Sequence, residues 1–137
     1  MNAMQLLDAA QRLIVSDLER WLDLFADTAI IEFPYAASLG TPSRLEGKDE
    51  MRAYFSSLPK MEGLSLTNVR RFPMADPNVA WLEMHGSAVI PSTGRHYEQD
   101  YVVYARAEDG KLVHYREYWD PQVAAVALGL TSSKGEA

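Results

Sequence analysis

Two acidic side chains in the last third of the chain, Asp100 and Glu117, lie among aromatic and aliphatic residues and could transfer protons. The surrounding stretch, residues 97–121, reads YEQDYVVYARAEDGKLVHYREYWDP. A carboxylate in a mostly apolar pocket has a raised pKa, which suits general acid and base catalysis near neutral pH. Two such carboxylates close together would also push their pKa values apart, so that one could act as base and the other as acid.

A β-hairpin is predicted to position both acids. Asp109 and Gly110 separate two alternating segments, and an Asp-Gly pair in that setting is a strong hairpin signal. Side chains alternate between the two faces of a strand. One face of the first segment therefore carries Glu98, Asp100, Val102 and Tyr104, and one face of the second carries Val113, Tyr115, Glu117 and Trp119.

The rest of the chain is predicted to supply helices and further strands. Apolar residues at three-four spacing indicate helix from Met4 to Ala26, broken or kinked near Val15–Asp17, where Ser-Asp is a capping signal. Strands are predicted at 28–33, 64–72 and 79–90, and helices at 50–58 and 122–128. Gly86 is predicted to mark a bulge in the longest strand. This order is typical of an α+β domain with helices against one face of a curved sheet.

Length and composition limit the class of protein. The chain has 137 residues, which suits one domain over 1–137, and 47% of them are hydrophobic, enough for a core. Its net charge of -6 is unfavourable for binding nucleic acid or an anionic membrane surface. There is no cysteine, no apolar run that could span a membrane and no signal-peptide pattern, so we expect a cytoplasmic protein. Residues 131–137 are expected to form a flexible tail.

Three stretches follow one another along the chain: LFADTAIIEFPYA, which begins at Leu24, LEGKDEMRAYF at 45–55 and DGKLVHYREYWDP at 109–121. In this order they resemble the nuclear transport factor 2-like fold, and more narrowly its SnoaL-like and ketosteroid isomerase-like branch. The resemblance implies a cone-shaped, curved antiparallel sheet that wraps around the N-terminal helices and encloses one cavity. It also implies a homodimer formed through the outer face of the sheet.

The resemblance further implies which side chains face the cavity. In the family the last-strand tryptophan points inward, which places Trp119, Tyr115 and Glu117 inside. The same alignment turns Asp100 and its alternate neighbours inward, opposite Leu82 and Met84. The predicted lining, which suits a small hydrophobic or aromatic molecule, is Phe33, Tyr54, Leu82, Met84, Val102, Tyr104, Tyr115 and Trp119.

The chain departs from the ketosteroid isomerases at the positions of their catalytic groups. Phe33 stands where the resemblance places their general base, and Val102 aligns with their oxyanion-hole aspartate, so their mechanism is not expected here. The phenazine-biosynthesis relatives match better, because their catalytic glutamate corresponds to Glu117. Their helical histidine corresponds to Tyr54.

No metal and no cofactor are expected. His85, His96 and His114 are not spaced as metal-ligand pairs, and the chain has no glycine-rich phosphate loop and no nucleophile elbow. His85 and His114 fall on the faces assigned to the outside of the sheet. A surface or interface role is therefore expected for both.

We therefore expect a small-molecule-binding protein, namely a cofactor-independent acid/base enzyme of the isomerase, cyclase or dehydratase type acting on a hydrophobic ketone. Asp100 and Glu117 are predicted to be base and acid, with Tyr54, Tyr104 or Tyr115 donating a hydrogen bond to a developing enolate oxygen. The alternative is a non-catalytic ligand-binding or dimerisation module. In that case both acids are structural, for example with Glu117 paired to Arg106.

Overall fold

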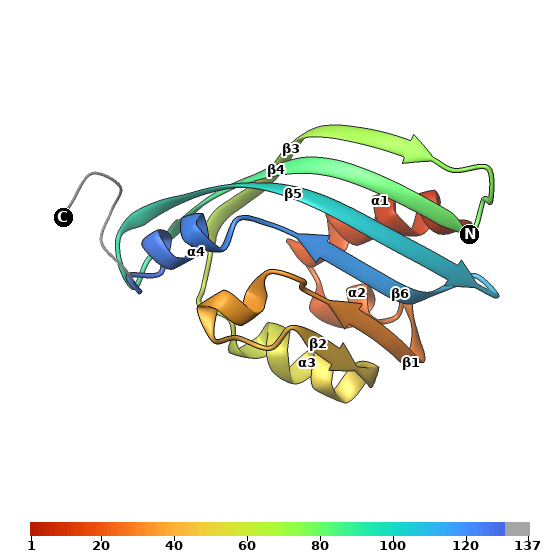
Figure 1. Cartoon of the computed structure of the whole chain (residues 1–137), viewed down its shortest axis with the longest axis horizontal. Helices are drawn as coiled ribbons and strands as arrows, with labels where there is room; N and C mark the ends of the chain where they lie inside the picture. Colours follow the sequence, from red (N-terminus) through yellow and green to blue (C-terminus); the bar gives the residue numbers. More distant parts are fainter. Residues whose placement is uncertain (131–137) are drawn as a thin grey trace.

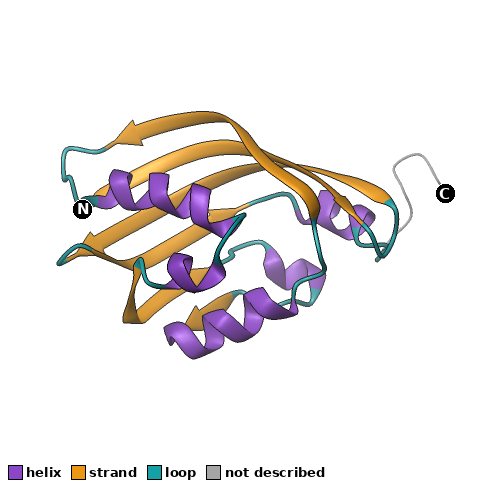
Figure 2. Cartoon of the chain, turned by 180° about the vertical axis from the view of Figure 1, so that it is seen from behind, coloured by secondary structure: helices purple, strands orange, loops and turns teal. Residues whose placement is uncertain are grey.

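The computed structural model describes residues 1–130 and has α+β architecture, as predicted. Figure 1 shows a curved, open sheet, and Figure 2 shows helices covering one of its faces. The sheet has six strands in the order β2-β1-β6-β5-β4-β3. We call the helix-covered face the inner face and the opposite one the outer face. The predicted tail at 131–137 lies outside the described residues.

The strands follow the sequence pattern closely. Their bounds are Phe25–Glu32 for β1, Arg44–Glu46 for β2, Glu62–Pro73 for β3, Val79–Ile90 for β4, Arg95–Glu108 for β5 and Lys111–Tyr118 for β6. Asp109 and Gly110 both have positive φ, at 52° and 75°, so the predicted Asp-Gly hairpin turn is confirmed. The resemblance implied an antiparallel sheet, and four of the five strand pairings within residues 1–130 are antiparallel, whereas that of β1 with β6 is parallel. No tight turn joins the first strand to the last, so turn chemistry does not fix their relative direction.

The helices are α1 at Ala3–Ile14, α2 at Leu18–Leu22, α3 at Gly47–Ser57 and α4 at Pro121–Ala127, with a short 3-10 helix, η1, at Ala36–Leu39. The predicted break near Val15–Asp17 is confirmed, because the Asp17 side chain accepts a hydrogen bond from the Arg20 backbone at 3.1 Å and so caps α2. The helical prediction up to Ala26 was too long. Phe25 already belongs to β1, where it is buried in the core.

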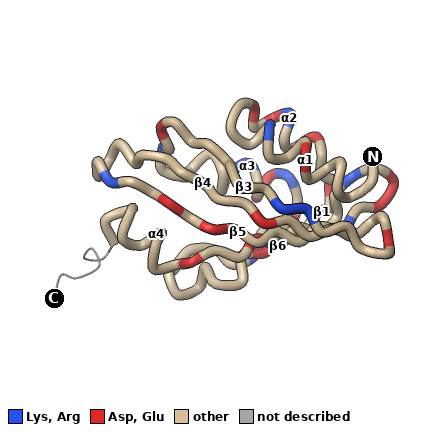
Figure 3. Tube along the Cα trace, turned by 90° about the horizontal axis from the view of Figure 1, so that it is seen from above, with Lys and Arg blue, Asp and Glu red and all other residues tan. Residues whose placement is uncertain are grey.

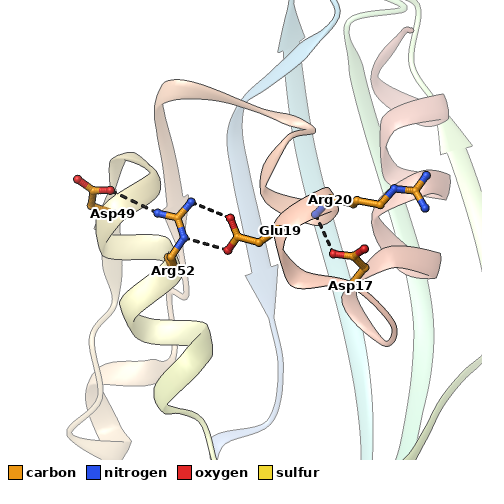
Figure 4. A network of polar contacts seen from close by, with 5 residues as sticks. All are labelled: Asp17, Glu19, Arg20, Asp49 and Arg52. Carbon is orange, nitrogen blue, oxygen red and sulfur yellow. Dashed lines mark hydrogen bonds and ion pairs between the residues drawn. The ribbon is translucent and has the colours of Figure 1, made fainter.

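A polar network holds α2 beside α3 (Figure 4). The Arg52 guanidinium donates to both carboxylate oxygens of Glu19, at 2.9 and 3.0 Å, and to Asp49 at 3.4 Å. The two-pronged geometry fixes the orientation of both side chains more than a single contact would. Because all three side chains are solvent-exposed, the network orients the helices more than it stabilises the fold.

Candidate functional site

A cavity of about 560 Å³ lies between the helices and the inner face of the sheet. Its walls come from α1, α2, the end of α3, the α3–β3 link and strands β3 to β6. Most lining side chains are apolar, and the volume falls within the range of small-molecule sites. The deep wall is formed by Trp21, Leu82, Met84, Tyr101, Val103, Tyr115 and Glu117.

Glu117 is the single acidic residue among those that line this cavity in the described part of the chain. It pairs across the sheet with Val103, which is 1% exposed, so both side chains project to the inner face. Burial raises the pKa of Glu117 to about 7, and the hydrogen bond that it accepts from the Tyr115 hydroxyl at 3.2 Å opposes that rise. The carboxyl group can therefore bind or release a proton near neutral pH.

Two further tyrosines complete the polar end of the cavity. Tyr101 lines the cavity, and its hydroxyl shares a 2.7 Å hydrogen bond with the hydroxyl of Tyr97. Burial raises the pKa of Tyr97 to about 12 and raises that of Tyr101 further; the charge of Glu117 adds to both shifts. Both tyrosines therefore stay protonated at neutral pH and can donate hydrogen bonds.

Gly86 makes room for Tyr101. A Cβ atom at this glycine would lie 2.9 Å from the Tyr101 ring, closer than a normal carbon contact. The predicted bulge at Gly86 is absent, because the pairing of β4 with β5 is regular through this position. The glycine instead allows an aromatic ring on β5 to lie against β4.

The predicted inward set on β5 was wrong by one residue. Met84 pairs with Tyr101 and Leu82 pairs with Val103, and cross-strand partners share a face. The inner face of β5 therefore carries the odd-numbered residues Tyr97, Gln99, Tyr101, Val103, Ala105 and Ala107, five of which are buried. Glu98, Asp100, Val102 and Tyr104 project to the outer face.

Asp100 consequently does not share a pocket with Glu117. Its side chain is 92% exposed and lies 2.8 Å from Nδ1 of His85, a residue on the outer face of β4. Glu98 contacts the other ring nitrogen of His85 at 3.3 Å and accepts a hydrogen bond from Ser87. The hydrogen bond to Asp100 raises the pKa of His85, and the hydrogen bond to Glu98 raises it by a smaller amount. The expected pair of interacting carboxylates in the cavity is therefore absent from the described residues. The acidic positions along β5 are red in Figure 3.

Tyr104 and Val102 are likewise outside the cavity. The Tyr104 ring packs edge-on against Trp81, with the ring centroids 5.2 Å apart. The Arg116 guanidinium carbon lies 4.7 Å from the centroid of the Tyr104 ring. Val102 is 36% exposed. The prediction that these two residues face the cavity is therefore wrong, because the strand register places both on the outer face. His114, which contacts Glu32, also lies on this face, where the sequence placed it.

The remaining predicted lining residues divide into two groups. Leu82, Met84 and Tyr115 line the cavity, as expected. Phe33 and Tyr54, also predicted to line the cavity, are not among its lining residues. Their rings stack with centroids 5.1 Å apart, and both contact Phe55, which does line the cavity. Burial and the charge of Glu117 raise the pKa of Tyr54 to about 12.

Trp119 lies at the boundary between two sites. Its ring centroid lies 6.4 Å from that of Phe33, and it packs against both the main hydrophobic core and a smaller cluster of buried residues that includes Ile90 and Ala124. It also lines an open groove on the surface. That groove runs between η1 and the start of α4 and includes Tyr35, Val102 and Tyr118. Trp119 is therefore not among the residues that line the inner cavity.

Sequence reasoning missed Tyr97, Gln99 and Tyr101, although the signal was present. From Tyr97 to Ala107 the odd positions of β5 carry no formal charge, whereas its even positions carry Glu98, Asp100, Arg106 and Glu108. Gln99 is 1% exposed, and both ends of its amide are hydrogen-bonded. The amide nitrogen donates to the Asp120 carbonyl at 2.9 Å, and the amide oxygen accepts from the Asp120 backbone N–H at 3.0 Å. It fixes the end of β6 and the start of α4 behind the two tyrosines.

Neither a metal site nor a membrane span is found in residues 1–130. No three histidine, aspartate or glutamate side chains within that range come together as metal ligands would. None of the helices in it has the length and apolar character needed to cross a membrane. The absence of a cofactor and the cytoplasmic location stay predictions from the sequence.

Comparison with known proteins places the chain in a family. Residues 7–115 match the model of the SnoaL-like domain. An uncharacterised PhzA/B-like protein of Pseudomonas aeruginosa is 35% identical over 130 residues, which cover 94% of this chain and 92% of that protein. The uncharacterised protein YesE of Bacillus subtilis is 35% identical over 85% of this chain and 80% of its own length.

Solved structures agree with this placement. A Bacillus subtilis protein named as a proposed isomerase superposes with a TM-score of 0.85 at 33% identity, covering 94% of both chains. A Mycobacterium tuberculosis protein in complex with estradiol-17beta-hemisuccinate has a TM-score of 0.76 at 25% identity, over 88% of this chain and 95% of that one. The Mycobacterium Δ5-3-ketosteroid isomerase shares the fold at 22% identity, with a TM-score of 0.70 over 88% of this chain and 94% of its own. The chain therefore belongs to the SnoaL-like family, in the nuclear transport factor 2-like superfamily.

Proposed function

We propose that this protein binds a small hydrophobic ketone in the inner cavity and moves a proton on it, as an isomerase, cyclase or dehydratase would. The observation that carries the proposal is the position of Glu117, the one acid among the described residues that line a mostly apolar cavity, where burial raises its pKa to about 7. A group whose pKa lies near the working pH can serve as base in one step and as acid in the next. The related proteins support this ligand class, since one is in complex with estradiol-17beta-hemisuccinate and another is named as a proposed isomerase.

One carboxylate is sufficient for the proton transfer. Ionised Glu117 removes a proton from the carbon next to the ketone carbonyl, and the electron pair of that C–H bond moves into the enolate. The protonated carboxyl then returns the proton to the same carbon or to a conjugated one, and the carbonyl reforms. Atoms and charge balance without an oxidant, a reductant or the second acid that the sequence predicted at Asp100.

The enolate oxygen needs a hydrogen-bond donor, and Tyr101 is the best placed to supply it. Tyr101 lines the cavity, stays protonated, and is held by its hydrogen bond with Tyr97. Tyr54, another donor predicted from the sequence, makes no side-chain hydrogen bond to another residue within 1–130, but it is not among the residues that line the cavity. Tyr115 is instead a positioning residue, because its hydroxyl already donates to Glu117.

The proposal includes a homodimer formed through the outer face. This face carries the large side chains of Phe72, Trp81, Val102, Tyr104 and Tyr118, of which Phe72 is 44% and Val102 is 36% exposed. Trp81, Tyr104 and Tyr118 are partly buried, and aromatic residues that lie together on a surface are typical of the central part of a protein interface. Two copies that meet through these residues would leave both inner cavities open.

Proton exchange on a probe ketone tests the proposed chemistry. In D₂O, the α-protons of 1-tetralone exchange for deuterium, and the loss of their proton NMR signal gives the rate. We expect the wild-type protein to accelerate this exchange and Glu117→Gln to abolish the acceleration. The rate should rise with pH through a midpoint near 7, because the carboxyl group must be ionised to act as base.

The matched control is Glu98→Gln, which removes an acid from the outer face and should leave the exchange rate unchanged. If 1-tetralone binds with no acceleration of exchange, the protein is a ligand-binding module and the enzymatic proposal is wrong. Equal acceleration by wild type and Glu117→Gln would reject Glu117 as the proton-transfer group.

A further inference from the structure

Two residues of opposite charge line the inner cavity, one at each end. Of the residues that line it in the described part of the chain, Glu117 is the one acid and Lys60 the one base. Glu117 lies on the sheet beside Val103 and Tyr115, which are 1% and 5% exposed. Lys60 lies in the exposed link between α3 and β3. The two charges are therefore separated by the depth of the cavity.

The mouth of the cavity is recognisable from the exposure of its lining. Val15 and Leu58 are 44% and 38% exposed, and both belong to the links that follow α1 and α3. Pro59 and Lys60 continue the second of these links, and Gln11 on α1 contributes an amide. A ligand that enters between the two links would pass Lys60 first and meet Glu117 last.

Lys60 is chemically available for a ligand. The other two lysines within residues 1–130 are already engaged: Lys48 pairs with Asp27 at 3.6 Å, and Lys111 donates to the Asp23 carbonyl at 2.5 Å. No ion pair or hydrogen bond joins the Lys60 ammonium to any other residue in that range. Asp8, one turn from Gln11 on α1, pairs with Arg71 at 2.7 Å and also accepts a long hydrogen bond from the Gln11 amide at 3.5 Å, so a ligand anion would have to replace that weak contact.

The pKa of Glu117 agrees with this separation. Burial raises this pKa and the hydrogen bond from Tyr115 lowers it, and the charge of Lys60 does not contribute to the shift. A ligand anion at the mouth would therefore be stabilised by Lys60 without disturbing the proton-transfer group. An anion placed next to Glu117 would instead raise the cost of ionising that carboxyl group.

We infer that the substrate is a hydrophobic ketone that carries an anionic group, such as a carboxylate, at the end opposite the reacting carbonyl, and that Lys60 with Gln11 binds this anion at the mouth. The inference rests on the proposed function of the same cavity. The anion makes the ligand enter in one orientation, carbonyl first, because the reverse orientation would bury its charge beside Glu117. Lys60 is thus a specificity-determining residue that does not touch the reacting atoms.

A matched pair of fluorescent probes tests the inference. N-phenyl-1-naphthylamine is neutral, and 1-anilinonaphthalene-8-sulfonate has the same ring system with an added sulfonate; both brighten in apolar sites. In Lys60→Met we expect the dissociation constant of the sulfonate to rise roughly threefold to tenfold, as suits one partly exposed charge contact. The dissociation constant of the neutral probe should stay unchanged. Lys48→Met, which removes the same charge away from the cavity, should alter neither constant.

Two further variants separate the possible failures. Leu66→Trp, which narrows the cavity from β3, should weaken both probes and so locate them there. If both constants respond equally to Lys60→Met, or neither responds while Leu66→Trp weakens both, the anion inference is overturned and the proton-transfer proposal still stands on the 1-tetralone assay. If Leu66→Trp affects neither probe, the cavity is not their site and the ligand class proposed for it is wrong as well.

Discussion

At the scale of single residues, the site depends on the environment of one carboxyl group. Glu117 is surrounded by apolar side chains, and its one hydrogen-bond partner within residues 1–130 is Tyr115. Burial without a cationic partner favours the protonated acid and leaves it ready to ionise near neutral pH. The same environment has a consequence for stability that can be measured without knowing the substrate.

Folding should become less favourable as pH rises from about 4.5 to 7. In that window the unfolded chain has already released the Glu117 proton while the folded protein still holds it. A shift of this size corresponds to roughly 3 kcal/mol. Glu117→Gln cannot ionise, so urea unfolding should show it equal to wild type at pH 4 and more stable by about that amount at pH 8.

The matched control is Glu62→Gln, an exposed acid on β3, which should retain the wild-type dependence on pH. A Glu117→Gln protein that is less stable than wild type at pH 8 would mean that the ionised carboxylate is a structural partner. The non-catalytic alternative would then be favoured.

Tyr115→Phe should shift the pKa of Glu117 upward. The tyrosine hydroxyl hydrogen bond opposes the effect of burial, and its loss leaves burial alone. The midpoint of the pH–rate profile for 1-tetralone exchange should therefore move to higher pH, with the limiting rate at high pH largely retained. A downward shift, or loss of the limiting rate as well, would show that Tyr115 acts on the ligand and not on Glu117.

At the scale of secondary-structure elements, β4 and β5 form the wall that holds Tyr101. Gly86 and Tyr101 lie on neighbouring strands, and the glycine leaves space for the ring. Gly86→Ala should destabilise the protein by roughly 1–3 kcal/mol, since the added methyl group overpacks the contact. In a Tyr101→Leu background the same change should be neutral or stabilising, because alanine is otherwise preferred to glycine within a strand.

The four proteins of this double-mutant cycle are the wild type, Gly86→Ala, Tyr101→Leu and the double variant. Their free energies of unfolding, measured with a chemical denaturant, give the coupling energy between the two positions. Equal destabilisation by Gly86→Ala in both backgrounds would show that the glycine is needed for a reason unrelated to Tyr101. The Tyr101 hydroxyl would then lack the support that the proposed donor role requires.

Element by element, the sequence predicted the fold better than the site. Alternation of apolar residues located β4 to the residue, and the Asp109–Gly110 pair located the hairpin. The direction of β1 against β6 was missed, because no local turn determines how the first and last strands pair. For the site, the face of β6 that carries Glu117 was predicted correctly and the face of β5 was not.

The error on β5 has a physical cause. Both of its faces contain large side chains, because Tyr104 and Val102 on the outer face are as apolar as Tyr101 and Val103 on the inner face. A shift of one residue in register exchanges the two faces completely. The distribution of charges was the better guide, since from Tyr97 to Ala107 the inner face has none and Asp100 therefore had to lie outside.

At the scale of the whole molecule, the two faces of the sheet have separate roles in the proposal: the inner face holds the ligand and the outer face forms the dimer. Sedimentation should show a dimer for the wild-type protein. Val102→Asp, which places a charge in the exposed centre of the outer face, should shift the population toward monomer. Ser56→Asp, an exposed position on α3, is the control and should remain dimeric.

The monomeric variant also tests whether the faces are independent. Binding of N-phenyl-1-naphthylamine to Val102→Asp should match the wild type, because none of the described residues that line the inner cavity belongs to the outer face. A wild-type protein that sediments as a monomer at all accessible concentrations would contradict the proposed dimer. Loss of probe binding together with dissociation would contradict the independence of the two faces.

The most direct test of the account is the titration of the Glu117 carboxyl group itself. With glutamate labelled by ¹³C at the side-chain carboxyl, NMR follows each resonance through a pH series, and the one missing from Glu117→Gln identifies the residue. We expect a midpoint of about 7 for Glu117, because burial raises the pKa of its carboxyl group. A midpoint near 4.5, the ordinary value for glutamate, would place the carboxyl group in water and contradict its role in proton transfer.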